Sequence, residues 1–469
     1  TKTMVSHLAY LLEARRVKPS QITAVTFTNQ AAGEMRVRIQ RELGRKRQLG
    51  NMRVGTFHAL CLEFLGQQGV EVALTDEREA GELAKQALED TGLSMSSRSF
   101  LSWVSKVKSG ISRPDGLTLE ETERRRKAMA RYQELLAERK RMDFDDLLLK
   151  VLAQLEPENG DANRADLAAI RRWREGCAYL LVDEFQDINP IQYRLMKAWN
   201  AGGRELFVIG DPDQSIYGFR GADAACFDRL REDFPDLEQV RLFKNYRSTS
   251  KIIKAALAVI EENPGGQRRL EAVGDGRTGI PVRIVEGGSE KSAAIFAAKE
   301  INGLTGGIGM LEAHEAAAHT TDQTVWGFGD IAVLYRTHRQ AELLEKCLRQ
   351  ESIPYVVAGR EAFLEADSVQ GTLNFFQYLL NQEDSYAGER AQRLLWGLDE
   401  NPLAHEILHL TAQEYRPLVC GRDKPRLLGE MGAHLTITLK SDIIETSRDC
   451  WEKWEQAKKV VDNADLGRY

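Results

Sequence analysis

Two adjacent carboxylates, Asp183 and Glu184, stand directly after the apolar run Tyr179 to Val182. Because ligands of open α/β sheets bind beyond the carboxyl ends of the strands, this pattern indicates a candidate site. There Asp183 could hold Mg²⁺ on the phosphates of a nucleotide, and Glu184 could orient and deprotonate an attacking water. A solvated acidic turn after a strand would have the same sequence, so the motif alone leaves both interpretations open.

A second polar segment, GDPDQSIYGFRGA at residues 210–222, follows the apolar run Leu206 to Ile209. Its Gln214 could contact a terminal phosphate through the side-chain amide. Tyr217 and Phe219 are spaced so that their flat faces could stack on the bases of a single strand. An ordinary turn with two core aromatic rings remains the alternative.

Two shorter segments carry groups that suit a nucleoside triphosphate. In NYRS at residues 245–248, Tyr246 could stack on an adenine and Arg247 could neutralise charge on a γ-phosphate. Lys2 and Thr3 open a predicted helix, as the last residues of a phosphate-binding loop do. Taken alone, NYRS is explained equally well by a helix start, and a single Lys-Thr pair is almost uninformative.

Three further segments suit either a nucleic-acid backbone or a helix start. TFTNQAA at 26–32 leaves a predicted strand and enters a helix, presenting hydroxyls, an amide and N–H groups to a phosphate. GTFH at 55–58 does the same, although His58 is more often a structural cap than a catalyst, and no nucleophile is paired with it. The acidic MDFDDL at 142–147 is interpreted as the first turn of a helix, where Asp is favourable.

The elements around these motifs predict α/β architecture. Continuous apolar strands alternating with helices indicate a parallel sheet, with strands expected at 22–27, 179–182, 206–209 and 240–243. A second α/β unit is expected from the apolar runs at 281–285, 330–335 and 355–358. Between residues 66 and 142 the pattern is helical, NPGG at 263–266 is a natural break between the units, and the chain after residue 381 is again mostly helical.

Composition narrows the class of protein. The 469 residues suffice for about three domains, and 42% apolar with 29% charged residues is ordinary for a soluble globular protein. No apolar run reaches the ~18 residues of a membrane span, and no secretory signal is present. Six scattered Cys argue against a zinc-finger or disulfide framework and fit a reducing cytosol. The first residue is not Met, as expected if the sequence begins inside a longer protein.

Charge is unevenly distributed along the chain. The net charge is −6, which argues against a wholly basic nucleic-acid coat protein. Residues 1–60, however, hold eleven Lys or Arg against three Glu, a net charge of +8. Because local charge matters more than the total, a nucleic-acid partner remains open.

The order of the motifs decides between these alternatives. Lys-Thr, TFTNQAA, GTFH, MDFDDLL, LVDEFQD, GDPDQSIYGFRGAD and NYRS occur in the order typical of one family. The chain resembles the superfamily 1 DNA helicases of the UvrD/Rep/PcrA type, clearly over residues 1–249 and more weakly over 330–381. The resemblance implies an α/β fold of two RecA-like P-loop NTPase domains with helical insertions. The implied domains are a motor domain 1A at 1–65 and 140–262, a helical insertion 1B at 66–139, an incomplete motor domain 2A at 263–382, and a helical segment at 383–469 that starts 2B.

The resemblance also implies a role for each motif residue. Those implied in binding ATP and Mg²⁺ are Lys2, Thr3, Asp183 and Tyr246, with Thr3 and Asp183 on the metal. Those implied in catalysis are Glu184 on the attacking water, Gln214 between the γ-phosphate and the DNA, and Arg247 as an arginine finger. Those implied along the path of single-stranded DNA are Thr28, Asn29, Thr56, Phe57, His58, Tyr217, Phe219 and Arg336.

The implied activity is ATP-driven 3′ to 5′ movement of a cytoplasmic enzyme along single-stranded DNA, with unwinding at junctions between single and double strands in repair or replication. Two departures weaken the expected DNA contacts: relatives usually carry Trp at position 219, and a basic residue is common where Gln30 stands. The glycines that precede Lys in a phosphate-binding loop and the late family motifs are not in this sequence. A catalytically incomplete nucleotide- or DNA-binding relative, or the motor part of a helicase-nuclease, is therefore the alternative.

Overall fold

The computed structural model describes residues 2–43, 51–70, 72–110, 117–156, 164–218, 222, 225–263, 268–273, 279–306, 326–358, 366–380 and 384–397. These residues fall into two compact units. The first unit contains the described residues up to Gln239 together with those from Leu373 onward, and the second contains those from Val240 to Thr372.

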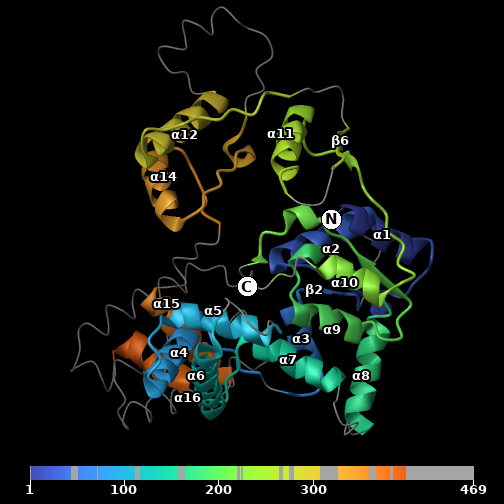
Figure 1. The fold of residues 1–469 in the computed structure, drawn as a ribbon, viewed down its shortest axis with the longest axis vertical. Coiled ribbons are helices and arrows are strands. Elements are labelled where there is room, and N and C mark those ends of the chain that lie inside the picture. The colour runs from blue at the N-terminus through green and yellow to red at the C-terminus, as the bar shows by residue number, and fades with distance from the viewer. Residues whose placement is uncertain are drawn as a thin grey trace, which may run out of the picture. The chain divides into compact units, whose positions relative to one another are not determined.

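The first unit is built on a four-stranded parallel sheet with the strand order β2-β1-β3-β4 (Figure 1). Its strands are β1 (Ile22–Val25), β2 (Arg53–Gly55), β3 (Tyr179–Val182) and β4 (Glu205–Val208). Every residue of β1 and β3 is buried, because helices cover both faces of the sheet. The predicted α/β fold class is confirmed, and the strands predicted at 22–27, 179–182 and 206–209 are present.

Alternate residues of the central strands face two separate cores. One core holds Ala24 and Leu181 and is completed by side chains of α1 (Lys2–Glu13) and α2 (Asn29–Leu43). The other holds Val25, Leu180 and Val182 and is completed by side chains of α3 (Phe57–Gly66), α7 (Phe144–Leu155), α8 (Arg164–Gly176), α9 (Pro190–Trp199) and α10 (Cys226–Asp233). This alternation follows from the two-residue period of a strand.

The segment expected to be a helical insertion forms three helices with a core of their own. They are α4 (Glu77–Thr91), α5 (Ser97–Lys108) and α6 (Leu119–Glu138). The core contains Leu83, Phe100, Trp103 and Tyr132. α16 (Ser385–Ala391) lies beside these helices, although it comes far later in the chain (Figure 1). It follows α15 (Asp367–Leu380) and precedes a short π-helical turn, Gln392–Trp396.

The second unit contains α11 (Ser250–Ile260), α12 (Glu290–Leu304), α14 (His338–Gln350) and one parallel pair of short strands, β5 (Lys244–Asn245) and β6 (Glu271–Ala272). Ala298, Ile301 and Leu348 belong to a small core between α12 and α14. Among the helices that the structure describes, none has the length and apolar character that crossing a bilayer requires.

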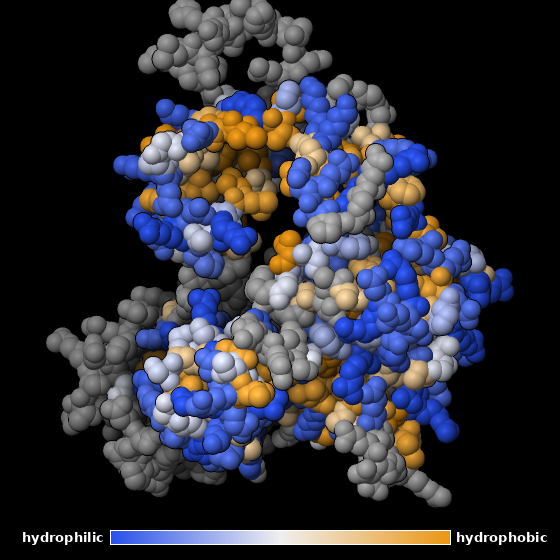
Figure 2. All heavy atoms as spheres, viewed as in Figure 1, coloured by the Kyte–Doolittle hydropathy of each residue, from blue (hydrophilic) through white to orange (hydrophobic). Residues whose placement is uncertain are grey.

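The strands predicted at 240–243, 281–285, 330–335 and 355–358 are wrong: these segments have no strand pairing. A strand exists only where a neighbouring strand takes its hydrogen bonds and other elements cover its faces. Here Ile284, Leu334 and Val356 are at least 95% exposed, so neither condition is met. Figure 2 shows apolar surface on this unit beside α12.

Candidate functional site

The carboxyl ends of three neighbouring strands meet at one edge of the first unit's sheet. Val182 is in register with Val25 on one side and with Val208 on the other. Beyond them the ladder continues, because Asp183 N–H donates to the Val25 carbonyl over 2.9 Å and Ile209 N–H donates to the Val182 carbonyl over 2.9 Å. We call the residues 183–187 and 210–217 that follow these strands the sheet tip.

Asp183 and Glu184 lie at the sheet tip in different surroundings. Asp183 is 8% exposed, and its burial, reinforced by the charge of Glu184, raises the pKa of its carboxyl group. Glu184 is exposed and has a φ of 51°, in the left-handed region that residues with a side chain rarely adopt. Such backbone conformations persist where surrounding contacts hold them and cluster at functional sites.

Glu184 and Gln214 are joined through two other residues of the sheet tip. The side-chain amide of Gln186 donates to Glu184 Oε2 over 2.7 Å, and its carbonyl oxygen accepts the N–H of Asp211 over 3.0 Å. Asp211 Oδ2 in turn accepts a hydrogen bond from Gln214 Nε2 over 2.6 Å. The structure therefore connects the loop after β3 with the loop after β4.

Lys2 and Thr3 lie in the first turn of α1, where both are exposed. Met4 and Leu8 of the same helix are buried against the core that also contains Leu181 of β3. The exposed N-terminus of a helix favours phosphate, because its free N–H groups and the positive end of its dipole point outward.

The sheet tip fits a magnesium nucleotide better than a bare metal. Among the residues that the structure describes, no group of three or more His, Cys, Asp or Glu side chains could hold a metal ion by itself. Mg²⁺ needs few protein ligands when phosphate oxygens complete its coordination. Asp183 and Thr3 supply oxygen atoms of the required kind, and Lys2 supplies a cation for phosphate.

The two predicted nucleic-acid segments of the first unit come together. Thr56 Oγ1 lies 3.5 Å from Asn29 Oδ1, which links the start of α3 to the start of α2. Thr56 also caps α3 by accepting the Ala59 N–H over 3.2 Å, and Thr28 Oγ1 accepts the Ala31 N–H over 3.1 Å. Both hydroxyls therefore organise helix N-termini on an exposed surface.

Phe57 and His58 are placed differently from the expectation of an open DNA path. The Phe57 ring is 5% exposed and stacks on Trp199, with ring centroids 5.4 Å apart, so this side chain belongs to the core. An aromatic residue at a helix start can face either way, and its sequence does not say which. His58 is half-buried, its burial lowers its pKa, and its ring lies edge-on to Phe144 at 5.6 Å.

Tyr217 is partly exposed at the sheet tip, and its ring packs against Phe27 with the centroids 4.8 Å apart. Phe27 was not predicted as a site residue. The signal was present, since Phe27 is the aromatic residue between the two threonines of TFTN and is the second residue after β1. Phe219, predicted like Tyr217 to stack on bases, lies outside the described residues.

The predicted site residues of the second unit are exposed. The Tyr246 side chain is 73% exposed, and Arg247 follows it in a turn that Asn245 closes by accepting the N–H groups of Arg247 and Ser248, each over 2.9 Å. Arg336 is also exposed, and its N–H donates to Gln340 Oε1 over 3.0 Å at the start of α14.

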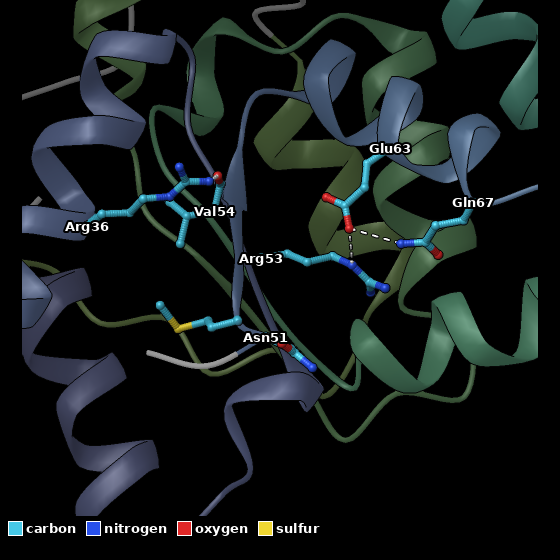
Figure 3. Close-up of a pocket in the computed structure, with 7 residues that line it drawn as sticks. Arg36, Asn51, Arg53, Val54, Glu63 and Gln67 are labelled. Carbon is cyan, nitrogen blue, oxygen red and sulfur yellow. Dashed lines mark hydrogen bonds and ion pairs between the residues drawn. The ribbon is translucent and has the colours of Figure 1, made fainter. Parts of the chain in front are cut away.

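A cavity of about 340 Å³ at the edge strand β2 was not predicted (Figure 3). Several of its polar groups pair with one another: Glu63 accepts from Arg53 over 3.0 Å and from Gln67 over 3.1 Å, and the Arg36 guanidinium donates to the Val54 carbonyl. Arg53 Nη1 is buried without a hydrogen-bond partner. Arg53 lies at the first residue of β2, away from the carboxyl ends of the strands. The cavity is therefore separate from the sheet tip.

Residues 1–235 match the UvrD/REP helicase N-terminal domain, and residues 240–405 match the UvrD-like helicase C-terminal domain. A protein named ATP-dependent DNA helicase PcrA from Staphylococcus epidermidis is 29% identical over 409 residues, which cover 83% of this chain and 51% of that protein. A protein of the same name from Staphylococcus aureus is 28% identical over 406 residues, with the same coverage. The chain thus spans about half the length of these curated relatives.

Proposed function

The chain belongs to the UvrD/Rep helicase family, and from that premise we propose that it is the motor part of an ATP-dependent DNA helicase. The observation that carries the proposal is the hydrogen-bonded connection at the sheet tip. It places the carboxylate of Glu184 and the amide of Gln214 in one network, as an enzyme needs if it is to hydrolyse a nucleotide in response to another ligand.

In this proposal, the motif residues bind and hydrolyse ATP. Lys2 holds the β- and γ-phosphates, and Thr3 and Asp183 hold Mg²⁺, which neutralises phosphate charge when bound. Glu184 accepts a proton from the attacking water while the water oxygen bonds to the γ-phosphorus and the bond to the bridging oxygen breaks. Tyr246 stacks on adenine, and Arg247 neutralises the charge that develops on the transferred phosphoryl group.

Single-stranded DNA is the proposed second ligand. The exposed starts of α2 and α3 supply polar groups for its phosphates through Thr28, Asn29, Thr56, His58 and the main chain of Phe57. Tyr217, Phe27 and Phe219 stack on bases, and Arg336 adds a contact from the second unit. Tyr217 lies three residues beyond Gln214, so a change in the γ-phosphate could move the stacking ring.

We further propose 3′ to 5′ movement, a preference for junctions of single and double strands, and action in the cytoplasm in repair or replication. In this proposal residues 1–65 and 140–262 form motor domain 1A and 66–139 form insertion 1B. Residues 263–382 belong to motor domain 2A, and the chain from 383 begins 2B. Closing of the two motor domains on ATP, and their opening after hydrolysis, would produce the movement.

The proposal is tested by the ATPase rate of the full-length protein with and without single-stranded DNA. We expect DNA to raise the rate, and Glu184→Gln to lower kcat by about 10²–10⁴-fold because the general base is lost. Glu63→Gln is the matched control, since its carboxylate belongs to the cavity at β2 and should leave kcat unchanged. Absence of stimulation by DNA, or an unchanged rate in Glu184→Gln, would refute the motor assignment.

A further inference from the structure

Gln186 is a buried amide whose polar atoms are all used at the sheet tip. The residue is 2% exposed. Its Nε2 donates to Glu184 Oε2 over 2.7 Å and lies 3.5 Å from Asp187 Oδ2. Its Oε1 accepts the Asp211 N–H over 3.0 Å, and its main-chain carbonyl accepts the Ser215 hydroxyl over 3.2 Å. One residue therefore contacts both loops of the sheet tip.

The backbone opposite Gln186 is shaped to admit the amide. A Cβ on Gly210 would lie 2.5 Å from Gln186 Oε1 and 3.0 Å from the Phe185 nitrogen, so a side chain at this position would displace one of them. Phe185 N–H donates to the Ile209 carbonyl over 3.0 Å, which fixes the approach of the two loops. Because a buried polar group is costly unless it is fully paired, this arrangement indicates more than the filling of space.

We propose that Gln186 is a positioning residue, which orients the Glu184 carboxylate and makes its orientation depend on the loop that carries Gln214. The inference rests on the proposed function, in which Glu184 activates water. Glu184 is exposed and has a strained backbone, so the Gln186 donor is what restricts its carboxylate. In this proposal, movement of Gln214 displaces Asp211, whose N–H is bound to Gln186 Oε1, and so moves the Gln186 amide.

The first test replaces the amide with an apolar side chain of similar length, Gln186→Met, in the full-length protein. We expect the DNA-stimulated kcat to fall by about 100-fold, the order of loss seen when a reacting group is misplaced by about 1 Å. The KM for ATP and the affinity for single-stranded DNA should stay within about twofold of wild type, since Gln186 contacts neither ligand. Gln192→Met is the matched control, because Gln192 caps α9 with Asn189 and makes no contact with Glu184.

A second variant, Gln186→Glu, separates positioning from folding. It keeps the shape and an oxygen for the Asp211 N–H, but it puts a carboxylate where Glu184 now receives a donor. We expect the same loss of kcat, with a KM for ATP and an affinity for single-stranded DNA that stay near those of wild type. The melting temperature should fall, because the new carboxylate is buried beside Glu184 and Asp187. Equal loss of kcat, KM, DNA affinity and melting temperature in both variants would overturn the proposal in favour of a structural role.

A double-mutant cycle tests the connection to Gln214. If both residues act through Asp211, Gln186→Met and Gln214→Ala should lower DNA stimulation of the ATPase non-additively. Additive losses, or full stimulation retained in Gln186→Met, overturn this inference alone. A wild-type protein that DNA does not stimulate refutes the proposed function itself, so the two failures are distinguishable.

Discussion

The sheet tip and the root of the helical insertion both bury carboxylates, but they compensate them differently. We define the root as Asp76, Glu79, Lys108, Arg141, Asp143, Asp146, Asp384 and Arg390. There Arg141 lies 3.3 Å from Glu79 and 2.7 Å from Asp384, and Lys108 lies 2.5 Å from Asp143. At the tip, Asp183 and Asp187 are the buried carboxylates, and the neighbouring Glu184 and Asp211 are held by the neutral amides of Gln186 and Gln214.

This difference indicates which of the two regions lacks a cation to balance its carboxylates. Within the described part of the chain, none of the tip residues Asp183, Glu184, Asp187 and Asp211 forms an ion pair with a Lys or Arg. Burial raises the pKa of Asp183 at the tip, and it also raises the pKa of Glu79 at the root, so the ion pairs rather than the pKa shifts distinguish the two regions. A root that neutralises its own charges serves the fold, whereas a tip that does not is suited to a cationic or metal-bearing ligand.

The largest expected effect is on stability at the root. Arg141→Met leaves Glu79 and Asp384 without their cation, so the free energy of unfolding should fall by about 3 kcal/mol, the low end for breaking a buried ion pair. Chemical denaturation measures this loss. Arg124→Met is the control, because Arg124 pairs with Glu120 on the surface and its loss should cost less than about 1 kcal/mol. Equal effects of the two variants would contradict the comparison.

The opposite result is expected at the tip. Asp183→Asn should lower the ATPase rate by roughly 100-fold or more, since a metal ligand is lost. Its free energy of unfolding should be unchanged or higher, because a buried charge without a counter-ion is removed. If calorimetry instead finds a loss of stability like that of Arg141→Met, the tip is a structural cluster and the comparison fails.

A smaller effect separates the aromatic residues of the two regions. Tyr217→Ala should weaken binding of single-stranded DNA by about 1–3 kcal/mol, the value of one base stack. Tyr386→Phe is its counterpart at the root, where Tyr386 lies beside Arg390, and it should leave DNA affinity unchanged. Fluorescence anisotropy with a labelled oligonucleotide decides this, and equal affinities of wild type and Tyr217→Ala would remove Tyr217 from the DNA path.

The last effect concerns pH. Burial raises the pKa of Glu79 from 4.5 to about 7, although Arg141 opposes the shift. A carboxyl whose folded-state pKa is raised adds stability that is complete below its ordinary pKa and is lost as pH rises through the folded-state pKa. Wild type should therefore lose more stability than Glu79→Gln between pH 4.5 and 7. Parallel unfolding midpoints for the two proteins across that range would show that Glu79 does not titrate at the root.

Local signals explain what the sequence could predict. β1 and β3 were predicted because buried strands are short apolar runs, and the position of Asp183 at the end of β3 was predicted because it follows one of these runs. The partners of Gln186 were not predictable, since Asp211 is 25 residues away and only the parallel register brings it close. Phe57 was predicted to line the DNA path, but its ring is in the core. The sequence alone does not tell which way an aromatic side chain points.

The strand predictions in the second unit failed for a related reason. Ile284, Leu334 and Val356 sit in apolar runs as strand residues do, yet a strand is defined by its neighbours. A run of β-branched and apolar residues shows only that the segment is compatible with a strand. The prediction that Arg247 and Arg336 of this unit are site residues consequently depends on the order of the motifs rather than on packing.

The contact of α16 with the root has a consequence for synthesis on the ribosome. Asp384 reaches Arg141 across 243 residues of chain, and Arg390 reaches Asp76 across 314. At about 5–20 residues per second, the ribosome needs roughly 10–50 s to make the stretch between Arg141 and Asp384. During that interval the root of the nascent insertion carries charges without their partners. We therefore expect the final packing of the insertion to be delayed until α16 emerges. A translational pause before residue 384 should prolong the exposure of the insertion to chaperones and proteases.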